Sequence, residues 1–132
     1  MTTSYDATYG ADSVVKTIDA WCPLTPTYQK TVDRIPAARA AGKYVWWYIC
    51  CVPHTPFTNW FVEQDAIESR LLMGAQTAKF RPDGFLYYFT NIWKDNTGID
   101  CSAGPFTTWN PVSWTTYHGD GSLFYCDIDV KR

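Results

Sequence analysis

The sequence has few charged residues, and it lacks both a basic cluster and a long apolar run. Its 11 Lys and Arg and 13 Asp and Glu make up 18% of the 132 residues and leave a formal charge of −2. Binding to a phosphate backbone needs concentrated positive charge, so nucleic acid is not expected as a partner. No stretch approaches the ~18 consecutive apolar residues of a membrane span, and the first residues lack the basic and apolar regions of a signal peptide. We therefore expect neither a membrane partner nor an export signal, and the sequence assigns no compartment.

Cysteine and histidine are also scarce and poorly spaced for a metal site. An odd number of cysteines leaves one thiol outside any set of disulfides, and zinc sites normally take closely spaced ligand pairs. Cys50 and Cys51 point to opposite faces if they lie in a strand. His54 and His118 lie far apart in the sequence. The favoured interpretation is that the cysteines are small buried residues, so no metal and no cofactor is expected. The five cysteines are Cys22, Cys50, Cys51, Cys101 and Cys126.

Aromatic residues, by contrast, are abundant, with 7 Trp, 9 Tyr and 7 Phe. Such a chain differs from the polar, aromatic-poor segments that stay disordered, so a packed core is expected. The length fits a single domain over residues 1–132.

Strand-like and helix-like segments alternate along the chain. Apolar, β-branched and aromatic runs predict strands at 17–24, 43–52 and 85–90. The run at 43–52 is typical of a strand buried on both faces, as in parallel sheets covered by helices. Residues 91–132 are predicted as a long irregular loop that ends in a strand or hairpin at 122–128.

Two helices are predicted between these strands. In the first, at 26–41, Pro36 either breaks the helix or begins a second short one. The second, at 62–80, has one apolar face. Acidic residues at its beginning suit the helix dipole, so a solvated helix start is favoured over a pair of catalytic carboxylates. The residues of the apolar face are Ile67, Leu71, Ala75 and Ala78, and the acidic residues are Glu63, Asp65 and Glu68.

The order strand, helix, strand, helix, strand predicts parallel strands joined by right-handed crossovers. In parallel α/β proteins the ligand lies at the carboxyl ends of the strands. A sugar ring stacks on an aromatic side chain there, while its hydroxyls need polar partners. We expect Trp21 and Trp93 to stack on sugar faces, whereas the alternative is that Trp21 and Tyr48 fill the core. The residues predicted to bind substrate are Asp19, Trp21, Tyr48, Tyr88, Asn91 and Trp93.

An ordered series of short segments resembles the carboxyl-terminal half of the catalytic domain of glycoside hydrolase family 123 and its uncharacterised relatives. The resemblance covers about residues 15–126 and depends on the order and spacing of the segments. These are residues 18–24 (IDAWCPL), 39–50 (RAAGKYVWWYIC), 59–61 (NWF), 70–72 (RLL), 83–88 (DGFLYY) and 119–125 (GDGSLFY).

The resemblance implies a partial (β/α)₈ barrel, that is, its last three parallel strands with two main helices and a long aromatic carboxyl-terminal loop. It also implies hydrolysis of N-acetyl-β-galactosaminides with retention, in which the substrate's acetamido group attacks the anomeric carbon, an Asp stabilises the intermediate and a Glu protonates the leaving oxygen. No Asp-Glu dipeptide occurs in the sequence. The chain is therefore expected to supply the sugar-binding wall of a β-N-acetylhexosaminidase, with an N-acetylhexosamine glycan as partner.

Two alternatives belong to other functional classes. The chain is a non-catalytic carbohydrate-binding or structural remnant of such a barrel, or an α/β domain without a sugar ligand. In each case an opened barrel leaves unpaired backbone at its edges, which favours self-association.

Overall fold

The structure is a computed structural model that describes residues 1–3, 6–12, 15–62, 65–90, 117, 120 and 123. The chain forms two compact units, Met1–Tyr87 and Tyr88–Arg132. None of the described helices is long and apolar enough to cross a membrane. The described elements are β1 (Ala20–Trp21), α1 (Thr25–Lys30), η1 (Val32–Arg34), α2 (Ile35–Ala40), β2 (Tyr44–Val45), β3 (Trp47–Tyr48), α3 (Ala66–Arg70), η2 (Leu71–Gln76), α4 (Thr77–Phe80) and β4 (Phe85–Leu86).

Residues 44–48, which hold β2 and β3, form the central strand segment of the first unit. Every second N–H group of this segment donates to a carbonyl of residues 19–23, at 2.8–3.1 Å. On the other side, the Trp47 N–H donates to the Gly84 carbonyl at 3.1 Å. β1 pairs with β2 and β3 pairs with β4, both in parallel. The predicted mixed α/β fold with parallel strands is therefore confirmed.

The amino-terminal residues add a further parallel segment that the sequence analysis did not predict. Thr2 forms a parallel bridge with Trp21 on the free side of β1. Its N–H donates to Ala20 at 3.0 Å, and its carbonyl accepts from Cys22 at 2.8 Å. Four parallel segments therefore lie side by side, from Thr2 through β1 and the central segment to β4.

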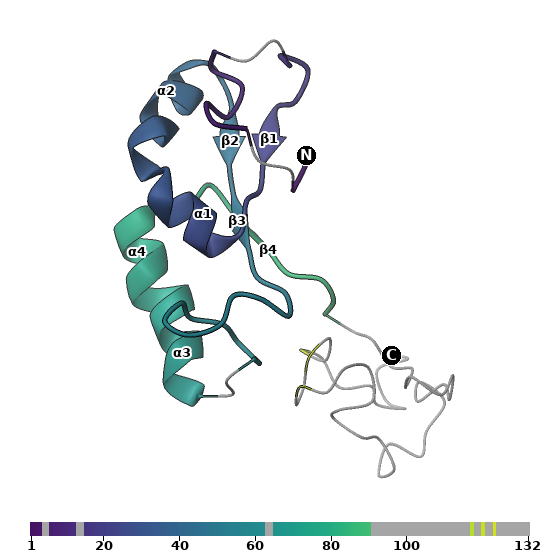
Figure 1. The fold of residues 1–132 in the computed structure, drawn as a ribbon, viewed down its shortest axis with the longest axis vertical. Helices are drawn as coiled ribbons and strands as arrows, with labels where there is room; N and C mark the ends of the chain where they lie inside the picture. The colour runs from purple at the N-terminus through teal and green to yellow at the C-terminus, as the bar shows by residue number, and fades with distance from the viewer. Residues whose placement is uncertain are drawn as a thin grey trace, which may run out of the picture. The chain divides into compact units, whose positions relative to one another are not determined.

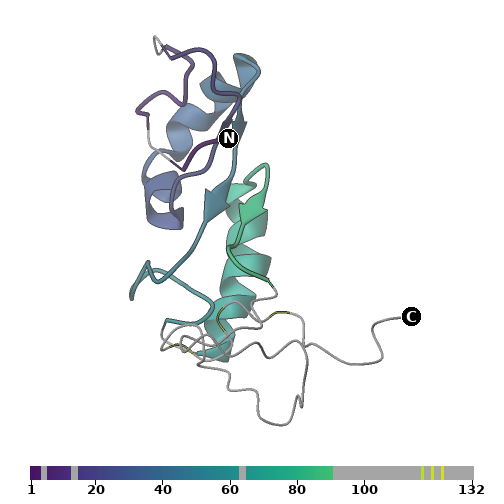
Figure 2. The ribbon, with the colours of Figure 1, turned by 90° about the vertical axis from the view of Figure 1, so that its right-hand side faces the viewer.

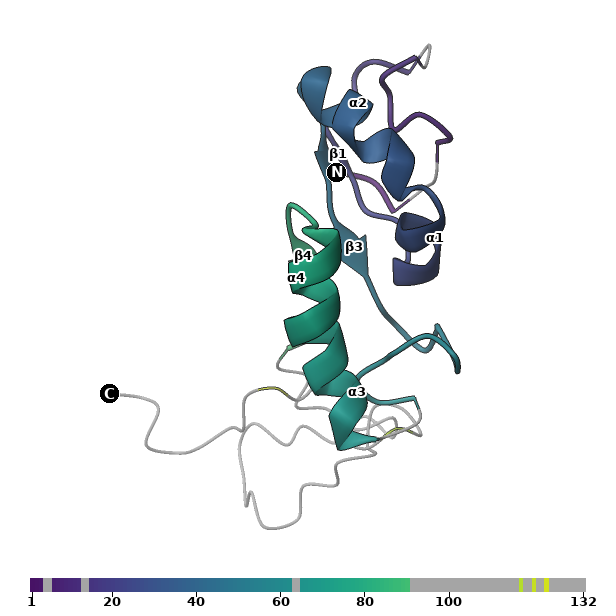
Figure 3. The same ribbon diagram turned by 90° about the vertical axis from the view of Figure 1, so that its left-hand side faces the viewer.

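The described helices lie on one side of these strands (Figures 1 and 3). Val45, Trp47 and Ile49 are buried on that side. Trp47 packs edge-on against Tyr28 of α1, with ring centroids 5.2 Å apart, and against Phe80 of α4, at 6.1 Å. Figure 2 shows the arrangement from the strand side, where β4 lies in front of α4.

The opposite face of the sheet is open within the described part of the chain, which corrects the prediction of a strand buried on both faces. Tyr44 is 59% exposed, and Trp46 and Tyr48 are only half-buried. Burial alternates from residue 44 to residue 49, as it does in a strand with one covered face. We call this surface, formed by Ala20, Leu24, Tyr44, Trp46, Tyr48, Gly84 and Leu86, the open face.

The first predicted helix consists of three short pieces, α1, η1 and α2. A proline occupies the first turn of both α1 and α2. The prediction that Pro36 begins a second short helix is confirmed, because proline suits a position whose N–H has no helical partner.

The second predicted helix begins later than expected and turns a different face to the core. Asp65 caps its start by accepting the Ile67 N–H at 3.1 Å, so its expected place at a helix start is confirmed. The predicted apolar face is wrong, since Ile67 is 57% exposed and Leu71 41% exposed, whereas Leu72 is fully buried. Residues 71–76 form a π-helical stretch. The side chain that packs against the sheet is therefore that of Leu72, one residue after the predicted Leu71.

Strand β4 is shorter than the predicted strand at 85–90. The strand or hairpin predicted at 122–128 falls outside the described residues except for Leu123. In the second unit, the Leu123 N–H donates to the Thr90 carbonyl at 2.9 Å.

Two glycines provide a matched test of the open face. A Cβ at Gly84 would lie 2.4 Å from the Trp46 ring, whereas a Cβ at Gly74 meets nothing within 4 Å. We expect Gly84→Ala to lower the free energy of unfolding by about 1–3 kcal/mol through overpacking and to change the tryptophan fluorescence. Gly74→Ala, in an exposed helical position, is expected to leave stability equal or raise it by up to ~1 kcal/mol. Urea denaturation measures both, and an equal effect of the two substitutions would contradict the contact between Trp46 and Gly84.

Candidate functional site

Tyr48 lies on the open face where the central strand segment ends. In register it lies between Leu24 and Leu86, and its N–H donates to the Pro23 carbonyl at 3.1 Å. Burial raises the pKa of its hydroxyl, and the nearby Cys50, Cys22 and Cys51 raise it further. At neutral pH the phenol therefore keeps its proton and offers both a hydrogen-bond donor and an acceptor.

Trp46 lies next to Tyr48 on the same face, two residues earlier in the strand. Its ring covers Gly84, where a side chain would clash with it. An aromatic ring beside a phenol hydroxyl is the combination that a sugar needs, because the C–H face of the sugar stacks while its hydroxyls form hydrogen bonds. Trp46 was not among the residues predicted to bind substrate.

The loop after the central segment is held by the buried side chain of Asn59. Its amide nitrogen donates to the carbonyls of Cys50, at 2.9 Å, and Pro53, at 3.2 Å. Its amide oxygen accepts the N–H groups of Trp60, at 2.6 Å, and Phe61, at 3.3 Å. No pattern in the sequence indicates this role, although Asn59 belongs to one of the segments that carry the family resemblance.

Glu68 of α3 connects the same loop to a helix. Its carboxylate accepts the Asn59 N–H at 3.1 Å. Of the predicted acidic group, Asp65 caps the helix and Glu63 lies outside the described residues. Both described carboxylates of this group thus serve local structure.

The structure does not bring Asp19 and Trp21 together with Tyr48. Trp21 pairs in register with Val45, on the face that the helices cover, and is only 3% exposed. Its ring lies edge-on to Tyr9, with centroids 6.4 Å apart, and its indole nitrogen lies against Gly10. This burial favours the alternative that Trp21 is a core residue over a stacking role.

Asp19 precedes β1 instead of ending it, so its predicted position at a strand's carboxyl end is wrong. Its backbone carbonyl accepts the N–H of Tyr44, the first residue of β2. Its carboxylate forms an ion pair with Lys43, just before β2, at 3.6 Å. Its side chain is 84% exposed. The reason is that the strand begins later than the apolar run suggested, which leaves Asp19 at the amino end of the sheet.

The remaining predicted residues follow β4. Tyr88 is 66% exposed and belongs to the second unit. Asn91 and Trp93 lie outside the described residues. Their roles stay predictions.

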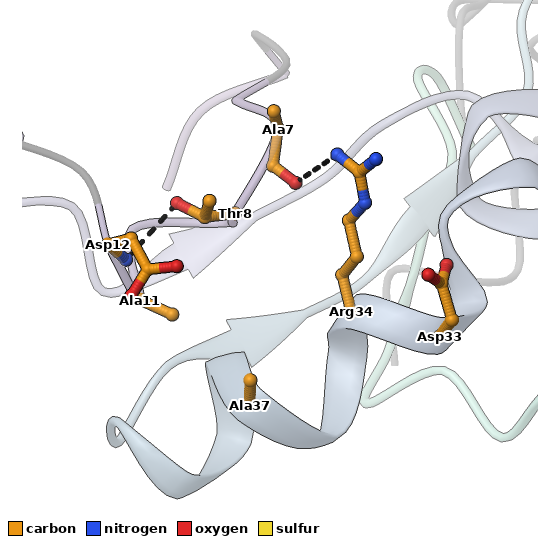
Figure 4. A pocket seen from close by; sticks show the side chains of 7 residues that line it. All are labelled: Ala7, Thr8, Ala11, Asp12, Asp33, Arg34 and Ala37. Atoms are coloured by element: carbon orange, nitrogen blue, oxygen red, sulfur yellow. Dashed lines mark hydrogen bonds between the residues drawn. The ribbon is translucent and has the colours of Figure 1, made fainter.

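A surface pocket lies away from these strand ends, between the amino-terminal loop and the helical pieces η1 and α2 (Figure 4). Its volume is about 300 Å³, and the Arg34 guanidinium at its edge donates to the Ala7 carbonyl at 2.7 Å. None of the residues that line it follows the carboxyl end of a strand. They are Ala7, Thr8, Ala11, Asp12, Asp33, Arg34 and Ala37.

Acidic residues are absent from the segments that directly follow β1 and β3. Residues 22–24 and 49–53 contain no carboxylate. Among the described residues, no group of three or more His, Cys, Asp or Glu side chains is arranged to hold a metal ion. His54 is exposed, and His118 lies outside the described residues.

Comparison with known proteins identifies the protein family. The family profile described as glycoside hydrolase 123, catalytic domain, matches residues 3–129. No curated protein matches the chain. The family match spans almost the whole sequence, including the described strands and helices and the loop held by Asn59.

The buried amide of Asn59 provides a test of this loop. In Asn59→Asp the two donors are replaced by an oxygen that faces the carbonyls of Cys50 and Pro53, so we expect the free energy of unfolding to fall by about 2–3 kcal/mol. Thr55→Ala, an exposed change in the same loop, is expected to stay within ~0.5 kcal/mol of the parent. Urea denaturation of both variants measures the effect. Parent-like stability of Asn59→Asp would show that the amide does not hold the loop.

Proposed function

Because the chain belongs to glycoside hydrolase family 123, we propose that it forms part of the sugar-binding wall of a β-N-acetylhexosaminidase of the N-acetyl-β-galactosaminidase type. The observation that carries this proposal is the open face, on which Trp46 and Tyr48 lie side by side next to the carboxyl end of the central strand segment. An aromatic ring and a protonated phenol suit a sugar face and a sugar hydroxyl.

We place Tyr48 in this wall as a hydrogen-bonding residue and Trp46 as an aromatic surface. Tyr88, Asn91 and Trp93 are proposed as sugar-binding residues on the sequence alone, because they follow β4 and parallel α/β proteins carry ligand residues after their strands. Asp19 and Trp21 are left out of the wall, since one lies at the amino end of the sheet and the other is buried under Tyr9.

The architecture proposed for the whole enzyme is a (β/α)₈ barrel. Parallel strands with all described helices of the first unit on one face support it, because a barrel has its helices outside and its strand side chains inside. In this arrangement the open face is the barrel interior.

The proposed reaction is substrate-assisted hydrolysis with retention, in which an Asp and a Glu act on the acetamido group and the leaving oxygen. The sequence contains no Asp-Glu dipeptide, and we propose that another part of the enzyme supplies both residues. The same absence favours a second candidate function, a non-catalytic carbohydrate-binding or structural remnant of the barrel.

Binding and turnover together test the proposal. We expect isothermal titration with N-acetylgalactosamine to show binding, and we expect no release of chromophore from a chromogenic β-N-acetylgalactosaminide above background. Tyr48→Phe should weaken binding about tenfold, which corresponds to the loss of one hydrogen bond worth ~1.4 kcal/mol. Tyr44→Phe is the matched control, because Tyr44 lies on the same face at the amino end of the segment.

Three outcomes would contradict the proposal. Equal affinity of the two variants would remove Tyr48 from the wall, and no binding by the parent chain would remove the wall itself. Turnover that persists through further purification would mean that another carboxylate acts as the acid.

We also propose that the chain associates with itself through the open face and the strand edges. Within the described residues, Tyr44 exposes 59% of its surface on that face, and β4 pairs only with β3. An aromatic face and unpaired edges favour pairing with another chain. Sedimentation velocity should show dimers or larger species whose fraction rises with concentration, and Trp46→Lys should shift the distribution toward monomer. A monodisperse monomer at all concentrations would contradict this proposal.

A further inference from the structure

Two neighbouring thiols, Cys50 and Cys51, lie exposed where the central strand segment ends. The expectation that they point to opposite faces required them to lie within a strand. The structure ends β3 at Tyr48, and both cysteines lie in bends after it. The expectation that these two cysteines are buried is therefore wrong, and only Cys22 fits it among the three cysteines that the structure describes.

The backbone around this pair is fixed on both sides. The Cys50 N–H donates to the Val52 carbonyl at 2.8 Å, which closes a tight loop around Cys51. The Asn59 side chain holds the carbonyls of Cys50 and Pro53 at 2.9 and 3.2 Å. Three hydrogen bonds therefore hold the four-residue backbone segment that carries the two exposed thiols.

The third described cysteine has a different environment. Cys22 is fully buried, and burial raises the pKa of its thiol to about 12. A thiol reacts as the thiolate, so Cys22 is inert in the folded chain. It therefore serves as an internal control for the exposed pair.

We propose that Cys50 and Cys51 form a reversible redox pair, which a low-molecular-weight disulfide such as oxidised glutathione converts to a disulfide between the two neighbouring residues. One thiolate attacks the small disulfide and releases one glutathione thiol. The second thiolate then attacks the mixed disulfide and releases the other. The protein loses two electrons and two protons, and the small disulfide is reduced to two thiols, so the reaction balances.

The geometry predicts that this bond is easily reduced. Neighbouring Cα atoms are ~3.8 Å apart across a trans peptide, below the ~4.4–6.8 Å of ordinary disulfides. Strained and exposed disulfides have more oxidising potentials and are the labile ones. The pair adjoins Tyr48, so its oxidation would change the surface next to the open face.

Trypsin digestion separates the cysteines into three peptides, which makes the test direct. Cleavage after Lys and Arg gives residues 17–30 with Cys22, residues 44–70 with Cys50 and Cys51, and residues 95–131 with Cys101 and Cys126. The full-length chain is incubated with oxidised glutathione, alkylated, digested without reduction and mapped by mass spectrometry. We expect peptide 44–70 to lose both alkylation sites, to be lighter by two hydrogen atoms than the unalkylated peptide, and to regain both sites after dithiothreitol.

Each other outcome overturns the proposal. In the first, peptide 44–70 carries alkyl groups on both cysteines, which shows that it was not oxidised. In the second, the peptide keeps a bound glutathione that the second thiol does not displace. In the third, the peptide is cross-linked to 17–30 or 95–131. Cys51→Ser should convert the product to a stable glutathione adduct on Cys50, whereas the matched variant Cys22→Ser should leave the intrapeptide disulfide unchanged. The mapping of the parent chain decides the proposal even where a variant fails to fold.

Discussion

The described fold depends on how the central strand segment, residues 44–48, satisfies its hydrogen bonds on both sides. One side is paired with residues 19–23, and the other is fixed by Asp83. The Asp83 carboxylate accepts the Val45 N–H at 2.7 Å, and its own N–H donates to the Val45 carbonyl at 3.0 Å. Arg39 of α2 holds the same carboxylate at 2.9 Å. A single acidic side chain thereby links the strand register to the helix layer.

This register decides which chemistry each face of the sheet carries. It turns Val45 and Trp47 toward the helices, where Tyr28 and Phe80 enclose the Trp47 ring. The same alternation leaves Trp46 and Tyr48 on the open face. Shifting the pairing by one residue would exchange the two sets, because successive side chains of a strand point to opposite faces. The proposed sugar-binding surface is thus a consequence of the pairing that Asp83 fixes.

The parts of the fold that were predictable are those with a local cause. Parallel strands follow from the alternation of apolar runs with helices, the break at Pro36 from its missing N–H, and the helix start from the Asp65 cap. The buried row of the second helix was not predictable in this way. Leu71 and Leu72 are adjacent and equally apolar, so only packing against the sheet determines that Leu72 is buried.

The candidate site was predictable only where the chain order fixes it. Tyr48 lies near the end of a strand, as the apolar run predicts, whereas Trp21 was predicted to bind the same substrate although the register between strands places it with Val45. A spacing of two within one strand indicates a shared face, but it does not relate the faces of two strands, which needs the pairing itself. The Asn59 amide was missed because its partners are backbone carbonyls, which no side-chain pattern in the sequence reveals.

Asn59 also connects the end of the central strand segment to the helix α3. Its backbone N–H donates to the Glu68 carboxylate of α3, while its side-chain amide donates to the carbonyls of Cys50 and Pro53. Because the bonds use backbone carbonyls, the loop can change its side chains without losing its position. This freedom is what a binding surface needs when its scaffold must stay constant while its specificity varies.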